Sequence, residues 1–341
     1  MDYKNFDLLI TGKASSGYEA RVTDSPQGRS PSGVPLVVPP DAAKSVTGLK
    51  DEQSLQAAGS ALWDALCATS TLREMLTNTM AVARAEGAGM RVRLSIEPPE
   101  LRNLPWELLY REPEGFLALC GRCSISRFIA VGGQPIRTLL APLPLRLLAV
   151  LSMPESLPLL NIDGERERIK EALADEQDKG WVETDFIERA TIANVRAKLL
   201  ERKHHVLHFV GHGQFVLNQA ALALEDENNQ LQPATSEVVG LTLAGLDSLR
   251  LVVLNACDTA LDSTVQPLVG IAPKIIQRTG VPAVVAMQAP ISDDAALVFV
   301  RQFYSQLASG QVIDDAMYEA RLAMVGETGM DSPEFAIPVL F

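Results

Sequence analysis

The second half of this sequence predicts an α/β fold, with a mostly parallel β-sheet covered by helices on both faces. Continuous apolar runs, typical of strands buried on both faces, recur between residues 146 and 289. Segments with apolar residues at helical spacing separate these runs. The first half instead begins with short hairpin-like runs and continues into a long helical stretch, which predicts a smaller α+β domain.

The elements of the first half follow from local patterns. Residues 1–50 contain the runs "FDLLITG", "GYEARVT" and "PLVVP", which are separated by Gly, Ser and Pro and predict hairpins. Apolar residues at helical spacing predict a helical region over 51–86, with a break near "CATST". Strand-like runs follow at 91–97 and 125–130. The Gly/Pro-rich segment 132–144 predicts a linker, so we expect two domains, 1–142 and 143–341.

The elements of the second half alternate between strands and helices. We expect strands at 146–154, 181–188, 205–211, 249–256 and 281–289, and helices at 162–176, 191–203, 267–280, 294–309 and 312–325. In sheets of this kind ligands bind at the carboxyl ends of the strands, where the loops leave the sheet. A functional site is therefore expected in those loops.

Composition excludes several classes of partner. The 42 acidic and 30 basic residues give a net charge of −12, which repels nucleic acid, so no direct nucleic-acid partner is expected. No apolar run has the length of a signal peptide or a membrane span, which predicts a cytoplasmic protein with no membrane partner. No Gly-rich phosphate loop ends in Lys-Ser or Lys-Thr, so no cofactor is expected.

All four histidines lie in the segment "ERKHHVLHFVGHGQF", residues 201–215. A metal site, a proton-transfer site and coincidence are the three explanations. Zinc is disfavoured and no metal is expected, because the pair Cys120 and Cys123 lacks a second close pair and ligands four apart on a strand do not chelate together easily. We expect His208 to be a hydrogen-bonded core residue. His204 and His205 are expected at the solvent end of the strand.

Two reactive side chains each follow the end of a predicted strand. His212 lies between Gly211 and Gly213 after one strand, and Cys257 follows "RLVVLNA" after another. The glycines allow a tight turn and are expected to present the imidazole. If the strands are neighbours, His212 and Cys257 meet at one sheet edge, as nucleophilic thiol catalysis requires. An inert buried thiol is the alternative for Cys257.

The pair "HFVGHG" and "VVLNACDTA", together with "LPWELLY" and the final "PVLF", resembles the CHAT proteases, a caspase-like family of clan-CD cysteine peptidases related to separase. The resemblance implies a six-stranded caspase-type sheet, preceded by a noncatalytic, pseudo-protease-like domain. It also implies that Cys257 is the nucleophile and His212 the general acid/base. The backbone amides of Gly213 and Cys257 would form the oxyanion hole.

The segment "SDDAA" at 292–296 has two interpretations. Related peptidases often select Arg or Lys through an acidic residue, and Asp293 lies after the strand that follows the nucleophile, so it is a candidate for the specificity pocket. The same residues are also a good helix N-terminus, with Ser292 or Asp293 as the cap.

The predicted function is a cysteine endopeptidase that cleaves a protein partner through an acyl-enzyme. The family resemblance implies a regulated effector of prokaryotic defence, linked to CRISPR or gasdermin systems. Because the chain shows no sensor repeat, a separate activator protein or an upstream protease is expected. The polar segment 224–237 is a candidate exposed gating loop. The alternative function is a noncatalytic binding or scaffold module with a caspase fold.

Overall fold

The computed structural model describes residues 2–39, 46–129, 139–157, 161–187, 189–256 and 267–341. The chain forms two compact units. The first combines Met1–Ala130 with Gln311–Ile337, and the second combines Val131–Gly310 with Pro338–Phe341. The sequence prediction puts a single boundary at residue 142, whereas in the structure the segment 311–337 also belongs to the first unit.

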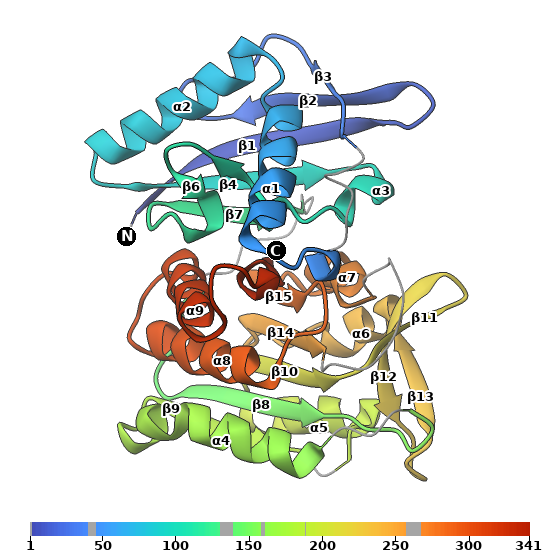
Figure 1. Ribbon diagram of the computed structural model, residues 1–341. Helices are drawn as coiled ribbons and strands as arrows, with labels where there is room; N and C mark the ends of the chain where they lie inside the picture. Colours follow the sequence, from blue (N-terminus) through green and yellow to red (C-terminus); the bar gives the residue numbers. More distant parts are fainter. Residues whose placement is uncertain (1, 40–45, 130–138, 158–160, 188, 257–266) are drawn as a thin grey trace. The chain divides into compact units, whose positions relative to one another are not determined.

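A five-stranded mixed sheet forms the centre of the first unit (Figure 1). Its strand order is β3 (Val34–Leu36), β2 (Gly17–Asp24), β1 (Tyr3–Lys13), β4 (Gly89–Ile96) and β7 (Cys123–Arg127). β1 pairs antiparallel with β2 and parallel with β4. Alternate residues of β1, Phe6, Leu8 and Ile10, are buried, as expected for a strand with one face against a core. The expected hairpins and α+β character are present.

Helices and short elements complete the first unit. The predicted helical region is two helices, and the break between them falls at "CATST". Asp51 caps the first helix through a hydrogen bond from the Ser54 amide, and the Ser54 side chain completes a capping box. The helices and short elements are η2 (Val46–Gly48), α1 (Glu52–Leu66), α2 (Ser70–Ala85), α3 (Pro99–Arg102), η3 (Trp106–Leu108), β5 (Tyr110–Arg111), β6 (Gly115–Phe116), η4 (Leu117–Leu119), α9 (Ile313–Thr328) and η5 (Pro333–Ala336).

Polar contacts hold α9 in the first unit. Arg91 of β4 donates from Nε to Asp314 at 2.7 Å, and the Tyr3 hydroxyl donates to Asp315 at 2.7 Å. Arg321, which is buried, donates to the carbonyl of Phe335. Tyr3 and Arg91 are far from α9 in the sequence, so no local pattern could assign the helix to this unit.

Gly59 allows close packing between α1 and η3. A Cβ atom at this position would overlap the carbonyl oxygen of Leu108 and lie 2.7 Å from Cβ of Tyr110. Gly59→Ala is therefore expected to lower the free energy of unfolding by about 1–3 kcal/mol, measured by urea denaturation. Gly326→Ala in α9 is the matched control, because its Cβ meets nothing within 4 Å. The control should raise stability by about 0.5–1 kcal/mol, and equal effects would contradict the packing explanation.

A six-stranded sheet forms the centre of the second unit. Its order is β16 (Pro338–Leu340), β15 (Ala283–Met287), β14 (Leu251–Ala256), β10 (Val206–Gly211), β8 (Leu145–Leu151) and β9 (Val182–Phe186). All neighbouring pairs are parallel except β15 with β16. The sequence prediction of a mostly parallel six-stranded sheet is confirmed.

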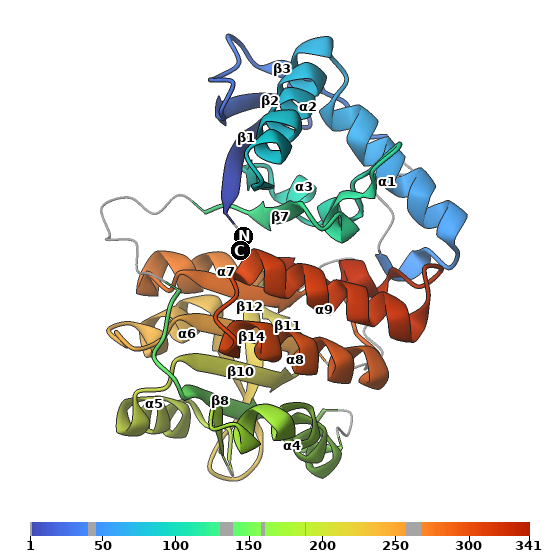
Figure 2. The same ribbon diagram turned by 90° about the vertical axis from the view of Figure 1, so that its left-hand side faces the viewer.

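Helices cover both faces of this sheet. Figure 2 shows α4 (Ile162–Asp178) and α8 (Asp293–Ala308) on one face, with α5 (Ile192–Arg202), α6 (Ser236–Leu243) and α7 (Pro267–Thr279) on the other. The central strands are accordingly buried on both faces, and β14 contributes Leu251, Val252, Val253 and Leu254, each at most 1% exposed. The predicted helical covering is confirmed.

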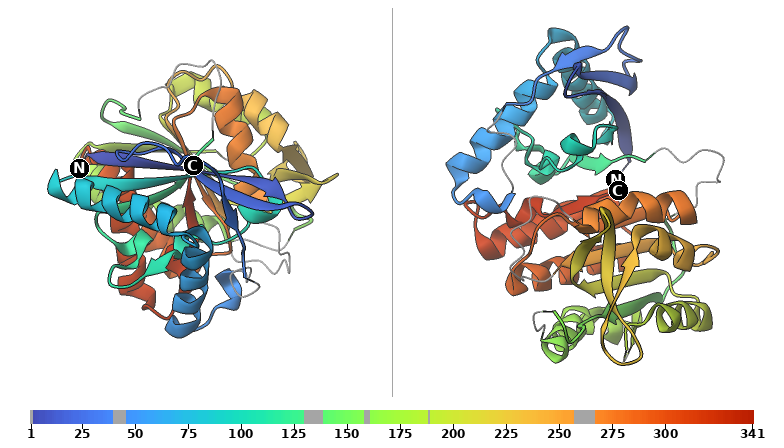
Figure 3. Two further views of the ribbon diagram at one scale, coloured as in Figure 1. Left: turned by 90° about the horizontal axis from the view of Figure 1, so that it is seen from above. Right: turned by 90° about the vertical axis from the view of Figure 1, so that its right-hand side faces the viewer.

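A three-stranded antiparallel sheet follows the carboxyl end of β10 (Figure 3). It consists of β11 (Gly213–Val216), β12 (Gln219–Glu225) and β13 (Leu231–Thr235). The Ser152 hydroxyl, just after β8, donates to the Ala223 carbonyl at 2.7 Å. The prediction of an exposed loop over 224–237 is wrong for most of its length, because β12, β13 and the start of α6 occupy it. Only the turn at 226–230 joins the two strands.

Among the described helices, none combines the length and apolar character needed to cross a bilayer.

Candidate active site

The register of β10 and β14 defines the candidate site. The two strands are parallel neighbours, and Gly211 is the register partner of Ala256. Adjacent strands lie about 4.8 Å apart, so the backbones that leave these two residues start side by side. His212 and Cys257 are the next residues in each chain segment. His212 is described by the structure, whereas Cys257 falls in 257–266, outside the described residues.

The two glycines beside His212 permit close packing. A Cβ on Gly211 would lie 3.0 Å from the Ser152 carbonyl oxygen, and a Cβ on Gly213 would lie 2.9 Å from Cβ of Pro267, the first residue of α7. Both distances are shorter than ordinary contacts. His212 is 5% exposed, and its carbonyl accepts a hydrogen bond from the Ala223 amide at 2.9 Å. The glycines therefore allow neighbouring segments of this polypeptide to pack closely around a largely buried His212. The sequence instead suggested that the His212 side chain would be exposed.

A buried polar layer lies below this edge, between the sheet, α4 and α8. The His208 Nδ1 atom lies 2.8 Å from the hydroxyl oxygen of Tyr304, and both side chains are fully buried. The prediction that His208 is a hydrogen-bonded core residue is confirmed. His208 Nε2 and Asn255 Oδ1 have no hydrogen-bond partner among the described residues, and both side chains line one small cavity. A neutral imidazole can donate from Nε2 and a carboxamide oxygen accepts, so the two groups are complementary.

The sequence contains a signal for Asn255. In the sequence, Asn255 is a polar residue at the end of the apolar run "LRLVVLNA", two positions before Cys257. Tyr304 is too distant in sequence to be found in this way.

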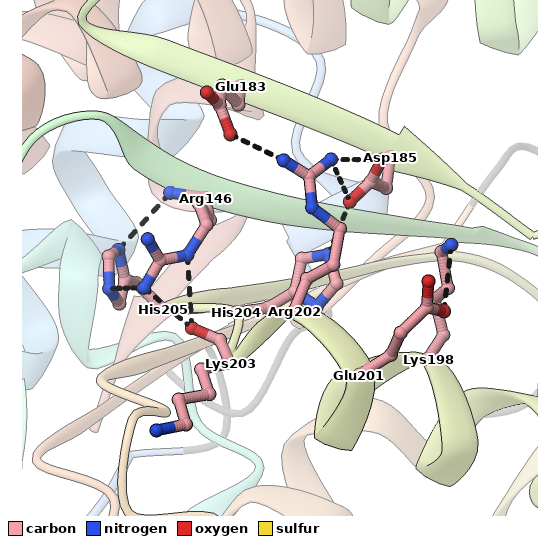
Figure 4. A network of polar contacts seen from close by, with 9 residues as sticks. All are labelled: Arg146, Glu183, Asp185, Lys198, Glu201, Arg202, Lys203, His204 and His205. Atoms are coloured by element: carbon pink, nitrogen blue, oxygen red, sulfur yellow. Dashed lines mark hydrogen bonds and ion pairs between the residues drawn. The ribbon is translucent and has the colours of Figure 1, made fainter.

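His204 and His205 lie at the amino end of β10, opposite the candidate site (Figure 4). His204 Nε2 is 2.7 Å from Asp185 Oδ2, and Arg202 bridges Asp185 to Glu183. His205 Nδ1 accepts from the Arg146 amide at 3.2 Å. Both histidines lie at the end of the strand, as predicted, but they are at most 3% exposed, so this end is not open to solvent. The ion pairs of β9 and α5 lie beside His204, and the Arg146 side chain lies against His205.

The geometry of the sheet and its edge agrees with a family match. The CHAT domain family matches residues 56–335. The chain belongs to the CHAT family. This membership and the six-stranded sheet support a caspase-like protease fold, as the sequence resemblance implied.

Two solved structures are similar to this CHAT chain. The crystal structure of the Arg-specific cysteine proteinase gingipain R has 11% sequence identity and a TM-score of 0.46, and the match covers 80% of this chain and 67% of that one. The Saccharomyces cerevisiae separase–securin complex has 14% identity and a TM-score of 0.41, and the match covers 85% of this chain and 19% of that one. No curated protein matched this sequence.

Asp293 of this CHAT chain is the first residue of α8. Ser292 is the N-cap, and its hydroxyl accepts from the Ala295 amide at 3.3 Å. The Asp293 side chain is 64% exposed, and its Oδ2 lies 3.0 Å from Nη1 of Arg168 in α4. The helix-capping interpretation of the segment is confirmed for Ser292. The pocket role of Asp293 stays a prediction, and Arg168 shows that the carboxylate can pair with a guanidinium.

The part of the CHAT chain that the structure describes contains no cluster of three or more His, Cys, Asp or Glu side chains arranged to hold a metal ion. Cys120 and Cys123 lie at a turn and at the start of β7, and Cys67 is buried at the end of α1.

Acid pH is expected to destabilise this CHAT chain through its buried histidines. Burial lowers the pKa of His208 to about 4, and burial with the nearby charges of Arg146 and Arg250 lowers the pKa of His205 to about 4. Both stay neutral in the folded chain but take up protons near pH 6.5 when unfolded. The contribution of the neutral histidines to the free energy of unfolding is therefore fully present above about pH 6.5 and is lost as the pH drops toward 4. Near pH 5 the loss is about 1–2 kcal/mol for each histidine.

Urea denaturation between about pH 7 and pH 5 tests this expectation. His208→Gln keeps a polar partner for Tyr304 and should have a shallower loss of stability than the wild type over that range. An unchanged slope would show that His208 does not carry the effect.

Proposed function

We propose that this chain is a cysteine endopeptidase in which His212 and Cys257 form the catalytic dyad. One observation carries the proposal: Gly211 and Ala256 are register partners at the carboxyl ends of two parallel strands, and the two proposed residues follow them directly. Family membership supports the same reaction class.

In the proposed reaction the His212 imidazole takes the proton of the Cys257 thiol, and the thiolate attacks the scissile carbonyl carbon. The backbone amides of Gly213 and Cys257 donate to the oxyanion. The protonated imidazole then gives its proton to the leaving amine, which breaks the C–N bond and leaves a thioester. A water molecule, deprotonated by His212, hydrolyses the thioester and restores the thiol.

We further propose that Asp293 contributes to selection of a basic residue before the cleaved bond. A substrate guanidinium would take the place that Arg168 has beside the Asp293 carboxylate. The remaining parts of the proposal rest on the family resemblance. They are a protein substrate, a separate activator or upstream protease, a cytoplasmic location and a role in prokaryotic defence.

Active-site labelling tests the proposal. Peptide acyloxymethyl ketones with Arg, Lys, Asp or Leu before the warhead would be added to the wild type and to Cys257→Ala, with and without lysate from activated cells. Intact mass and peptide mapping would locate the label. We expect one adduct on Cys257, with Arg or Lys preferred.

The matched pair Asp293→Asn and Asp294→Asn tests the pocket, since both residues are exposed in the first turn of α8. Only Asp293→Asn should weaken the preference for basic probes. If no probe labels Cys257 in either condition while the fold is intact, the peptidase proposal is wrong. The alternative, a noncatalytic scaffold module, would then be adopted.

A further inference from the structure

A pair of thiols lies in the first unit, and the proposed peptidase reaction does not use it. Cys120 and Cys123 are the ends of the turn Cys120-Gly121-Arg122-Cys123, which joins η4 to β7. The Cys123 amide donates to the Cys120 carbonyl at 2.7 Å, so the four residues form a closed turn. Such turns bring their end Cα atoms within about 7 Å, and disulfides commonly join Cα atoms about 4.4–6.8 Å apart.

The two side chains already face each other, since their thiols share a hydrogen bond. Gly121 lies against α9, because a Cβ there would be only 3.1 Å from the ring of Tyr318. The turn is therefore held between β7 and α9. The closed turn already brings the two Cα atoms into the range of separations that disulfides span.

The environments of the two thiols differ. Cys120 is half-buried, whereas Cys123 is 3% exposed. The hydrogen bond from Cys123, followed by one from the Arg122 amide, lowers the pKa of Cys120 to about 6. The same contact and burial raise the pKa of Cys123. An accessible thiolate beside a protected thiol is the arrangement in which one sulfur attacks and the other resolves.

Other uses of the pair fit the structure less well. A metal would need further ligands, and no cluster of three or more potential ligands occurs in the residues that the structure covers. Two inert core thiols would both be buried, as Cys67 is, with its pKa raised by burial to about 12.

We propose that Cys120 and Cys123 form a reversible disulfide and so constitute a redox modification site, oxidised by low-molecular-weight disulfides such as glutathione disulfide. The Cys120 thiolate attacks one glutathione sulfur, forms a mixed disulfide and releases one glutathione thiolate. Cys123 then loses its proton to that thiolate and attacks the Cys120 sulfur. This step releases the second glutathione, so two protein thiols and one glutathione disulfide become one protein disulfide and two glutathione thiols.

The test uses the full chain carrying Cys257→Ala, which makes the result independent of the proposed peptidase. The protein would be equilibrated with reduced and oxidised glutathione at several ratios, blocked with an alkylating agent and digested with trypsin. Trypsin cleaves after Arg122, between the two cysteines. We expect the peptides Glu112–Arg122 and Cys123–Arg127 to stay joined in oxidising buffer and to separate after a reductant is added.

Two variants sharpen the outcome. Cys123→Ser should trap a glutathione adduct on Cys120, because the resolving thiol is gone, whereas Cys120→Ser should leave Cys123 largely unmodified. In the unmodified pair, Cys120 should react with a thiol reagent at neutral pH at least tenfold faster than Cys67. If the two peptides never stay joined in an excess of glutathione disulfide, or if Cys120 reacts no faster than Cys67, the proposal is wrong.

Discussion

Replacing His212 with alanine is expected to lower the rate constant for acylation of Cys257 by about 10²–10⁴-fold near neutral pH. The reason is the proposed proton transfer, since without the imidazole only the small ionised fraction of the thiol can attack. The rate of His212→Ala should therefore rise with pH through about 8.5, the pKa of a free thiol, while that of the wild type changes less over this range. The measurement is the rate of labelling by the preferred probe as a function of pH.

His205→Gln provides the control, because it removes a histidine from the opposite end of the same strand. It should keep the labelling rate within about a factor of three, well below the effect expected of a lost general base. If the labelling rate of His212→Ala and its pH dependence equal those of the wild type, Cys257 reacts without this base. In that case the dyad, though not the nucleophile, would be wrong.

The second large effect is expected in the first unit, where Arg127 and Glu107 form a buried ion pair. Arg127 Nη2 lies 2.8 Å from Glu107 Oε2, and Nε donates to Oε1 at 3.2 Å. Their side chains are 4% and 0% exposed. Arg127→Met leaves a buried carboxylate without its bidentate partner and removes the hydrogen bond to the Leu104 carbonyl. The free energy of unfolding should fall by about 3–5 kcal/mol.

Urea denaturation followed by tryptophan fluorescence measures this effect, since Trp63 and Trp106 both belong to the first unit. The double variant Glu107→Leu with Arg127→Met should recover part of the loss, because the carboxylate that Arg127→Met leaves without its partner is also removed. Arg301→Met is the control, as its ion pair with Glu171 is exposed and should contribute at most about 1 kcal/mol. Equal losses for Arg127→Met and Arg301→Met would contradict the argument from burial.

Local patterns in the sequence were sufficient for most of the fold. Apolar runs located β8, β10, β14 and β15, and helical spacing located α1, α2, α4 and α8 close to their observed ends. These elements are defined by the side chains that each buries. The burial of His208 was also predictable, because a histidine within an apolar strand must share the environment of its neighbours.

The missed features depend on contacts between distant residues. β12 is rich in Ala and Leu, and β13 is short and contains Pro233, so neither carries a strong strand signal. Their pairing with each other and with β11 overrides local preference. The contacts of Arg168 with Asp293, and of α9 with β4, are likewise defined only when the chain has folded.

The assignment of α9 has a consequence for how the molecule can be divided. The backbone passes between the two units three times, near residues 130, 310 and 337. A single cut in the first of these connections would therefore produce a fragment that carries the second unit and still contributes Phe335 and Ala336 to the hydrophobic core of the first. The two pieces would stay associated through that packing after the peptide bond is lost. For this protein, cleavage of the backbone and physical release of a unit are separate events.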